Sequence, residues 1–509
     1  MTAAQIIMII TIAAYLVMML IVGFICSKKN NSVGDFYLGG RKLGPIVTAM
    51  SAEASDMSSW LLMGLPGLAY ASGICDPGWT ALGLIIGTYV SWLIVAKRLR
   101  NYTEHSNSIT LPDFFANRWR DKKILMGVSA VIIIVFFVPY TGSGFAACGK
   151  LFNSLFGIDY HIAMIVAALI IISYTCFGGF LAASHTDLIQ SIIMTIALII
   201  AVFLGISYAG GWDNVVDNAQ GLPGYLSVTQ TYSPATGEAN DYGLLTIISN
   251  MAWGLGYLGM PHFLLRFMAI RNSKEIKTSR RIATVWVIVA MTVAILIGVV
   301  GLGITANGNL ESLADPETIM VALANLMSEN HILLAVIGGL ILSGILACTM
   351  STADSQLLAA SSSATENLLR GTFGIKISDK MAMIIARVAL VVIAAVGVII
   401  AWDPDSSVFQ IVSFAWAGFG AAFGPLVVAA LFWKRSNKYG AIAGIVVGGV
   451  MVFVWKYLIA PIGGAWNIYE LLPAFILSFI AIVVVSLATG EPDKEIVDEF
   501  EEVRAMEKA

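Results

Sequence analysis

The chain has 509 residues, of which 58% are hydrophobic and only 12% are charged, and its mean hydropathy is +0.84. A soluble protein carries about a quarter of its residues as charged side chains, so this composition excludes a soluble enzyme and indicates a polytopic membrane protein. The formal net charge of -3 is informative only through its distribution along the chain.

Apolar runs of about 20 residues are long enough to cross a bilayer as helices. The first run, 6–26, lacks a basic leading region and an Ala-x-Ala cleavage site, so we expect a retained helix rather than a signal peptide. Together the runs predict an all-α protein with about thirteen transmembrane helices, at residues 6–26, 45–72, 78–97, 124–150, 160–180, 187–209, 243–270, 282–305, 331–363, 381–402, 407–433, 439–458 and 466–489.

Basic residues gather in alternate loops. The intervening segments 210–242 and 306–330 carry acidic residues and neither Lys nor Arg. Since cytoplasmic loops are enriched in Lys and Arg, this pattern predicts an amino terminus outside the cell and a carboxyl terminus in the cytoplasm. The basic clusters lie in the loop with Lys28, Lys29, Arg41 and Lys42 and in the loops around 97–123, 271–281 and 434–438.

The ten predicted helices after the first divide into five plus five. An odd number of helices in each half makes the halves insert in opposite orientations, which is the inverted-repeat arrangement of many secondary transporters. The predicted organisation is a first helix and cytoplasmic loop at 1–44, a first repeat at 45–209, an extracellular loop at 210–242, a second repeat at 243–433, two further helices at 434–489 and a tail with a short solvated helix at 490–509.

Within the second predicted span, residues 51–60 contain two carboxylates, Glu53 and Asp56, and four hydroxyls where a lipid-facing helix has leucines. An ionisable group at bilayer depth costs several kcal/mol unless it is paired or wetted, so it indicates a functional site. Two neighbouring carboxylates cannot both stay charged there without a cation or a donor between them. Glu53 is therefore either a structural residue with its own hydrogen-bond donors or a residue that couples ion movement to transport.

A second interruption follows about two hundred residues later, where three glycines and Pro261 break an apolar run at 253–261. Broken helices in corresponding positions of two halves point to the binding site of a secondary transporter. Carbonyls released at a break suit Na⁺, because hard cations prefer oxygen ligands, whereas the amino end of a half-helix favours a substrate carboxylate.

A third group of oxygens lies in the run 331–363. Ser351 and Thr352 offer neighbouring hydroxyls, and the carbonyl of Cys348 lies one turn before Thr352. Such hydroxyls alone often bond to the preceding helical turn. Their clustering with an acidic residue, opposite a broken helix, favours a cation site.

Four aromatic residues, Trp60, Tyr140, Trp253 and Tyr257, neighbour the two breaks. Each alone is typical of packing, but together they suit a cavity for a small substrate with an apolar ring and a charged or zwitterionic end. Asp187 follows Gly178-Gly179 and is either the cap of a new helix or a residue of a gate or ion path.

The sequence contains one segment that resembles a phosphate-binding loop but is not one. Residues 144–151 have the glycine and lysine spacing of a phosphate-binding loop, but Leu151 replaces the Ser or Thr that binds Mg²⁺, and no strand precedes it. ATP-driven transport therefore has no support. The sequence also holds no clustered nucleophile and base and no metal-ligand set, so we do not expect an enzyme.

At these residues the chain resembles the sodium:solute symporter family, and closely its bacterial proline-transporting members. The resemblance covers nearly the whole chain and implies a LeuT-like fold of five-plus-five inverted repeats in the bacterial cytoplasmic membrane. It rests on Leu38-Gly39-Gly40-Arg41, Ser55-Asp56-Met57-Ser58, Thr110-Leu111-Pro112-Asp113, Gly178-Gly179-Phe180, Trp253-Gly254-Leu255-Gly256-Tyr257, Met350-Ser351-Thr352 and the run 416–425.

The resemblance also implies residue roles. The sodium site would comprise the carbonyls of Ala54, Met57 and Cys348 and the hydroxyls of Ser351 and Thr352. By this resemblance Arg41 and Asp187 are expected coupling or gating residues. Glu53 is a further candidate for coupling from its place beside Asp56, and not from the resemblance. The expected substrate site comprises Asp56, Ser58, Trp60, Tyr140, Trp253, Tyr257 and Pro261.

The expected function is Na⁺-coupled import of L-proline by alternating access, with Na⁺ as the co-transported ion and no organic cofactor. One alternative is Na⁺- or H⁺-coupled uptake of another small solute, such as glycine betaine. A second alternative is a membrane sensor that does not transport, against which the short tail after Leu487 argues.

Overall fold

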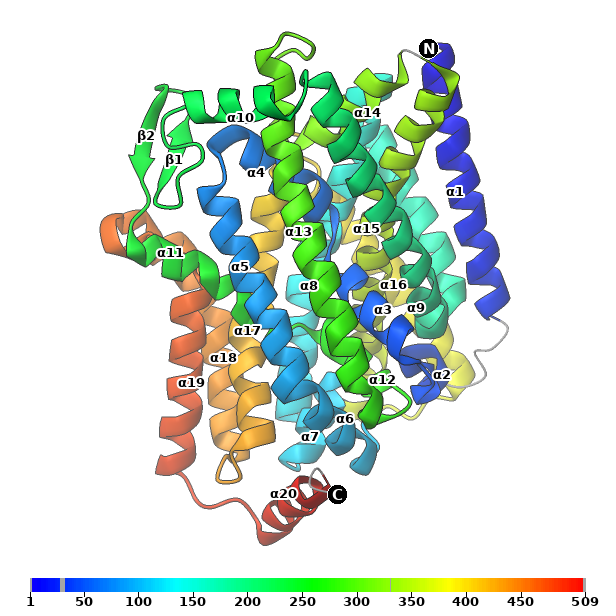
Figure 1. Cartoon of the computed structure of the whole chain (residues 1–509). Coiled ribbons are helices and arrows are strands. Elements are labelled where there is room, and N and C mark those ends of the chain that lie inside the picture. The colour runs from blue at the N-terminus through cyan, green and yellow to red at the C-terminus, as the bar shows by residue number, and fades with distance from the viewer. Residues whose placement is uncertain (1, 28–32, 330, 507–509) are drawn as a thin grey trace.

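The computed structural model describes residues 2–27, 33–329 and 331–506. Lys28 and Lys29 of the first predicted basic loop lie outside these ranges. The described chain is a bundle of helices that run between two ends of the molecule, with the amino terminus at one end and the carboxyl terminus at the other (Figure 1). Opposite ends for the termini agree with an odd number of crossings.

The first half of the chain contains, in order, α1 (Ala3–Ser27), α2 (Val33–Leu38), η1 (Gly39–Arg41), α3 (Pro45–Asp56), η2 (Trp60–Gly64), α4 (Leu65–Ser72), α5 (Cys75–Val90), η3 (Ser91–Val95), α6 (Ala96–His105), α7 (Leu111–Arg118), α8 (Ile124–Phe156), α9 (Tyr160–Tyr208), α10 (Trp212–Gly221), β1 (Gln230–Ser233) and β2 (Glu238–Asp241).

The second half contains α11 (Leu244–Met251), η4 (Ala252–Leu258), α12 (Pro261–Ala269), η5 (Ser273–Glu275), α13 (Ile276–Ala306), η6 (Pro316–Thr318), α14 (Ile319–Ser328), α15 (Ile332–Ser362), η7 (Ser363–Thr372), α16 (Asp379–Ile400), α17 (Val408–Phe432), α18 (Lys438–Val454), η8 (Trp455–Ile459), η9 (Ala460–Ile462), η10 (Gly464–Trp466), α19 (Leu471–Ala488) and α20 (Lys494–Met506).

The number of crossings agrees with the sequence prediction. Ten helices of the described chain are long and apolar enough to span a membrane. Two shorter apolar helices, Tyr160–Cys176 and Leu244–Leu258, and the interrupted segment from α3 to α4 account for three more. Together these segments make thirteen crossings.

Both predicted breaks are present. α3 ends at Asp56, Met57 leaves the helical region with φ -78° and ψ 77°, and the chain resumes at Trp60. In the second break, η4 is a 3-10 helix, and Met260, with ψ 111°, separates it from α12. Gly256 is required at this crossing, because a Cβ there would lie 2.0 Å from Nε1 of Trp416 on α17.

A third interruption lies inside α9, where Gly179 has φ 63° and divides the element into two helices. The second of these begins directly at Phe180, so Asp187 lies two turns inside a helix. The cap interpretation of Asp187 is therefore wrong: its backbone sits within a continuous helix and its side chain is fully buried.

Two extramembrane segments differ from expectation. The 210–242 segment contains a short antiparallel hairpin, β1 with β2, which adds a small sheet to an otherwise helical fold. The tail does form a helix, α20, but the helix is not wholly solvated. Its residues Ile496, Phe500 and Val503 are buried, and α20 packs on α6.

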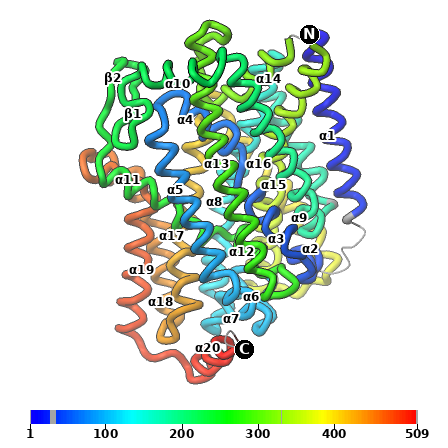
Figure 2. The backbone as a smooth tube through the Cα atoms, in the orientation of Figure 1, coloured from blue at the N-terminus to red at the C-terminus, as the bar shows by residue number. Residues whose placement is uncertain are grey.

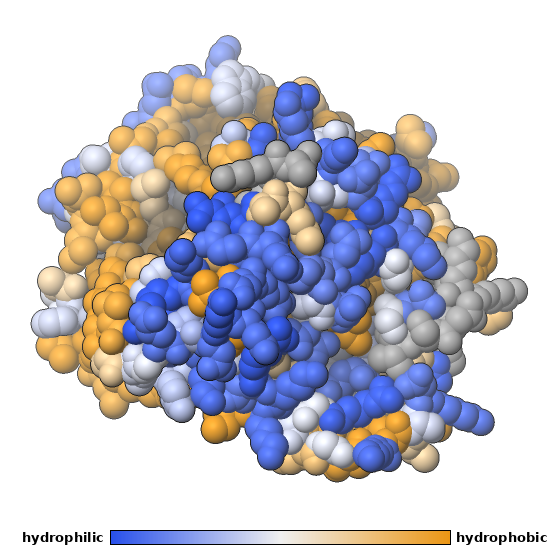
Figure 3. All heavy atoms as spheres, turned by 90° about the horizontal axis from the view of Figure 1, so that it is seen from below, coloured by the Kyte–Doolittle hydropathy of each residue, from blue (hydrophilic) through white to orange (hydrophobic). Residues whose placement is uncertain are grey.

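The broken segments meet in the interior. α3 packs against α9, α12, α13 and α15, which surround it in the backbone view (Figure 2). Seen from the end that carries α20, the molecule shows a hydrophilic face with hydrophobic side chains around its rim (Figure 3). Exposed side chains at this end include Arg120 and Lys434. This distribution is expected for a protein whose flanks lie in lipid and whose ends lie in water.

Candidate substrate and ion site

The oxygen-rich turn of α15 faces the end of α3. The hydroxyl of Ser351 donates to the carbonyl of Ala54 at 2.7 Å, and the hydroxyl of Thr352 lies 3.5 Å from the same carbonyl. Ser351 also donates to Cys348 in its own helix at 3.1 Å. Ala54 lies three residues before Met57, where α3 ends. Two hydroxyls of α15 and the carbonyl of Ala54 on α3 thus lie together in one buried site.

Asp56 is fully buried and makes contacts with both breaks. Its Oδ2 accepts a hydrogen bond from the hydroxyl of Tyr257 on η4 at 2.6 Å. Its backbone carbonyl accepts from the hydroxyl of Tyr140 at 3.3 Å and from Nε1 of Trp60 at 3.4 Å. Its Oδ1 has no hydrogen-bond partner among the described residues. This atom is free to accept a donor from a bound molecule or to contact a cation.

Trp253 lies at the centre of an aromatic group. Its ring centroid is 6.1 Å from that of Trp60 and 5.3 Å from that of Phe409. Nε1 of Trp416 donates to the backbone carbonyl of Trp253 at 2.7 Å. The Trp416 ring also packs edge-on against Tyr257, at 5.2 Å between centroids. Phe409 and Trp416, both on α17, were not predicted as site residues from the sequence.

The other two expected substrate residues, Ser58 and Pro261, lie at the first and the second break. Ser58 is buried, and its hydroxyl is 3.5 Å from the backbone nitrogen of Trp60. Pro261 begins α12 and lines a separate small cavity that also contacts Ile109 and Leu265. The residue after it, His262, is buried beside the ring of Tyr140 and has no sequence signal beyond its place at the break.

Glu53 has hydrogen-bond donors of its own. Its Oε1 accepts from the hydroxyl of Thr88 at 3.0 Å and from Nε1 of Trp92 at 2.9 Å, both from the α5–η3 segment. Asp56 instead accepts from Tyr257. The two carboxylates therefore point to different neighbouring helices, which favours the structural reading of Glu53.

A buried ion pair between α12 and α9 lies beside Ser51 of α3. A guanidinium nitrogen of Arg266 on α12 is 3.1 Å from Oδ2 of Asp187, and Nε of Arg266 is 3.0 Å from the hydroxyl of Ser51. Ser51 donates to the same Asp187 oxygen at 2.6 Å. Arg266 also donates to Ser355 on α15. The guanidinium group of Arg266 thus connects four membrane helices, α12, α9, α3 and α15.

This group continues to Asp354, which accepts from the hydroxyls of Ser355 and Tyr174. Neither Arg266 nor Asp354 was predicted as a site residue from the sequence. A sequence signal for Arg266 was available, because a basic residue within the apolar run 243–270 indicates a functional site just as an acidic residue does.

Arg41 has a different environment from the other two expected coupling residues. Its guanidinium donates to the carbonyls of Thr103, Ser108 and Met268, at 2.7, 2.8 and 2.6 Å. These partners follow or end α6 and α12, at the end of the molecule that carries α20 (Figure 1). Arg41 thereby holds the ends of two helices together through backbone carbonyls at or just after their last turns.

A polar cavity of about 400 Å³ lies on the other side of the aromatic group, between α4, η6 and the start of α17, with Phe409 in its wall. Lys150 in the same wall forms ion pairs with Asp315 at 2.8 Å and with Glu317 at 3.0 Å. Since the Phe409 ring packs on Trp253, the cavity reaches the aromatic group from the end of the molecule that carries the amino terminus.

Two broken helices that meet an oxygen-rich third helix at the centre of a thirteen-span bundle define a secondary transporter. The sequence model of the sodium:solute symporter family matches residues 36–448. The chain is 41% identical over 485 residues to the high-affinity proline transporter of Bacillus subtilis (strain 168), covering 95% of this chain and 98% of that protein. It is 40% identical to a sodium/proline symporter of Staphylococcus aureus, covering 97% and 95%.

Solved structures agree on the fold. A Na⁺-coupled sialic acid symporter in a substrate-bound outward-open state has a TM-score of 0.78 at 17% identity, covering 96% of this chain and 99% of that chain. The nucleobase-cation-symport-1 transporter MHP1 in a closed conformation has a TM-score of 0.55 at 13% identity, covering 92% and 98%. The fold is the LeuT-like five-plus-five inverted repeat, and the chain belongs to the sodium:solute symporter family.

Proposed function

We propose that this protein imports L-proline together with Na⁺ across the bacterial cytoplasmic membrane by alternating access. The observation that carries the proposal is the meeting of Ser351 and Thr352 with the Ala54 carbonyl, beside an Asp56 carboxylate that has one free oxygen. The relatives at 40–41% identity are named as proline transporters or sodium/proline symporters, which supports proline as the substrate.

This geometry supports the following proposed site residues. The carbonyls of Ala54, Met57 and Cys348 and the two hydroxyls of α15 bind Na⁺. Asp56 receives the substrate's ammonium group, and the ring of proline packs against aromatic side chains. These are Trp60, Tyr140, Trp253 and Tyr257, with Ser58 and Pro261 at the two breaks.

The proposed orientation places the amino terminus outside and the carboxyl terminus in the cytoplasm. The basic segments 97–123, 271–281 and 434–438 adjoin α6, α7, α12 and α17, whose ends lie on the side of α20 (Figure 1). Positively charged loops remain in the cytoplasm. The polar cavity beside Phe409 then opens to the outside and is the entry path for proline.

Uptake into proteoliposomes tests the function. One Na⁺ that crosses ~100 mV contributes about 2.3 kcal/mol, and a tenfold Na⁺ gradient adds about 1.4 kcal/mol. For one Na⁺ per proline, these two contributions support an accumulation on the order of five-hundredfold. We expect radiolabelled proline to accumulate with an imposed Na⁺ gradient and not with a K⁺ or H⁺ gradient. Equal uptake without Na⁺, or competition by glycine betaine and not by proline, would contradict the proposal.

Ser351→Ala and Thr352→Ala each remove one oxygen ligand of the proposed Na⁺ site. We expect each variant to raise the Na⁺ concentration for half-maximal uptake about tenfold, while proline binding at saturating Na⁺ changes less. The matched control is Ser343→Ala, because Ser343 is buried on the same helix and donates only to Gly339. A wild-type Na⁺ dependence in both site variants would place the ion elsewhere.

Glu53→Gln keeps an oxygen acceptor for Thr88 and Trp92 and removes the charge. Since Glu53 has its own donors and does not contact Asp56 through any hydrogen bond in the described chain, we expect transport with an unchanged Na⁺ and pH dependence. Uptake measured from pH 5.5 to 8.5 checks this. A lost pH dependence, or a changed ratio of Na⁺ to proline, would instead identify Glu53 as a coupling residue.

A further inference from the structure

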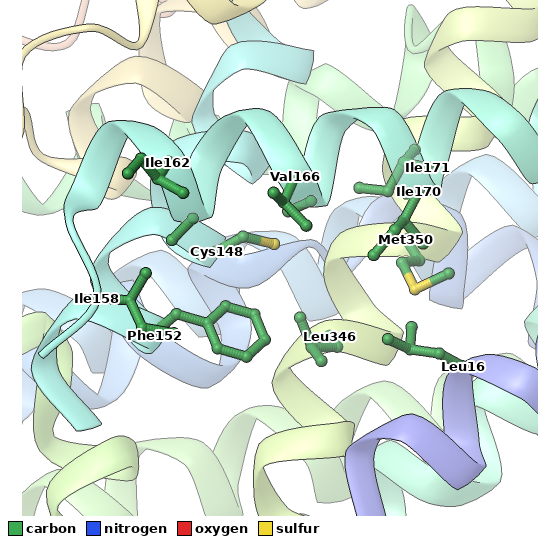
Figure 4. A pocket seen from close by; sticks show the side chains of 12 residues that line it. Leu16, Cys148, Phe152, Ile158, Ile162, Val166, Ile170, Ile171, Leu346 and Met350 are labelled. Carbon is green, nitrogen blue, oxygen red and sulfur yellow. The ribbon is translucent and has the colours of Figure 1, made fainter. Parts of the chain in front are cut away.

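A cavity of about 230 Å³ lies apart from the proposed transport path, between α1, the last turns of α8, the first half of α9 and α15. Figure 4 shows side chains from these four helices directed into one space. The residues that line it are Leu16, Cys148, Phe152, Ile158, Ile162, Ala163, Val166, Ala167, Ile170, Ile171, Leu346 and Met350.

The walls of this cavity exclude a polar occupant. Its twelve side chains carry no charge and no oxygen or nitrogen atom, and their only heteroatoms are the sulfurs of Cys148 and Met350. A water molecule needs two to four polar partners, and an apolar cavity of about 150 Å³ stays dry and binds benzene or xenon. Neither Na⁺ nor zwitterionic proline can therefore occupy this cavity, whereas a hydrocarbon group can.

The cavity is continuous with the lipid-facing surface. Ile162 and Val166 line it, and they are also 59% and 50% exposed on the flank of a membrane-spanning helix. Between them and the interior, Ala163 and Ala167 lie one turn apart on α9 and leave the hollow unfilled. The exposed side chains of Ile162 and Val166 thus place the opening on the surface that faces bilayer hydrocarbon.

We propose that this cavity is a binding site for an acyl chain of a bilayer phospholipid, inserted between α1 and α9. The chain end reaches Leu346 and Met350, which are only 4% and 3% exposed. The apolar side chains that line an empty cavity lack contacts on one side. A bound acyl chain supplies these contacts and so stabilises the complex.

The bound chain packs on the back of the oxygen-rich turn of α15. Leu346 and Met350 flank Cys348 along this helix, and Met350 directly precedes Ser351. Met350 is held from two further sides, because its carbonyl accepts from Tyr174 at 3.1 Å and its sulfur from Tyr15 at 3.8 Å. The occupant therefore completes the packing around a turn that carries hydroxyls toward Ala54.

Photo-crosslinking tests the site. The full-length protein is reconstituted in phosphatidylcholine vesicles that contain a phosphatidylcholine with a diazirine near the end of one acyl chain, and adducts are mapped by mass spectrometry after irradiation. We expect adducts on Leu346 and Met350, which lipid on the outer surface cannot reach. Ala167→Phe, which fills the cavity, should lower their yield at least fivefold, and the control Leu169→Phe, on the lipid-facing side, should not.

Ala163→Met is a second variant whose larger side chain fills the cavity. It keeps the test valid if Ala167→Phe fails to fold. Adducts on Leu346 and Met350 no more frequent than on buried core peptides would overturn the proposal, as would a yield unchanged in both filled variants. The same yield with a phosphatidylglycerol probe supports recognition of the chain, whereas a requirement for one headgroup contradicts it. The adduct pattern does not depend on the transported solute, so its failure is distinct from failure of proline uptake.

Discussion

Replacement of Asp56 by asparagine is expected to raise the Na⁺ concentration for half-maximal proline uptake about a hundredfold or to abolish uptake. The carboxylate is fully buried, one oxygen accepts from Tyr257, and the other is free for the ion or the substrate's ammonium group. A hydrogen bond to a charged group contributes about 1.5–3 kcal/mol, and the loss of a full charge in a site of low dielectric adds to this. Uptake and direct proline binding over a range of Na⁺ concentrations check this.

Tyr257→Phe is the matched control for this experiment. It removes the donor to Asp56 and leaves both the carboxylate and the aromatic ring in place. We expect it to raise the proline concentration for half-maximal uptake more than the Na⁺ concentration, with some effect on both because linked binding is reciprocal. If Asp56→Asn retains the wild-type Na⁺ dependence while Tyr257→Phe loses it, Asp56 is not the residue that links ion and substrate.

The second large effect is expected at the buried pair of Arg266 and Asp187. Arg266→Met removes the cation that faces Asp187 and leaves a carboxylate with only the Ser51 hydroxyl as donor. Removing one partner of a buried ion pair costs about 3–5 kcal/mol of stability. We expect a large loss of folded protein in the membrane and a lower thermal unfolding midpoint of the protein that remains.

The double variant Arg266→Met with Asp187→Asn separates stability from coupling. A neutral pair avoids the uncompensated charge, so the unfolding midpoint should recover most of the loss. Transport should not recover, because the connection from α12 to α9, α3 and α15 is gone. A double variant as unstable as Arg266→Met alone would show that the pair acts through packing and not through charge.

Much of the fold could be predicted from the sequence, because a bilayer imposes helices of a fixed length on apolar runs. The breaks at Asp56 and before Pro261 were also predicted, since polar and helix-breaking residues are conspicuous in such runs. The uninterrupted helix around Asp187 was not. Gly178-Gly179 suggested a longer gap, yet Gly179 alone supplies the turn with its positive φ.

The site could be predicted only in part, because a sequence shows which residues are unusual and not which ones meet. Ser351 and Thr352 were found, and their approach to Ala54 follows from packing between α3 and α15. Phe409 carries no such signal, since an aromatic residue in an apolar run is ordinary. Trp416 lies in the family-like run 416–425 but was not predicted as a site residue. Whether Glu53 shares the environment of Asp56 depended on side-chain direction, and the structure turns it toward Trp92.

The interrupted segment from α3 to α4 has a consequence for how the protein enters the membrane. Its two helices, of 12 and 8 residues, are each too short to cross a membrane alone. An acidic residue at the centre of a helix adds about 2.5–3.5 kcal/mol to its insertion, and α3 carries Glu53 as well as Asp56. We therefore expect this segment to enter the lipid together with the following span, whose Thr88 and Trp92 donate hydrogen bonds to Glu53.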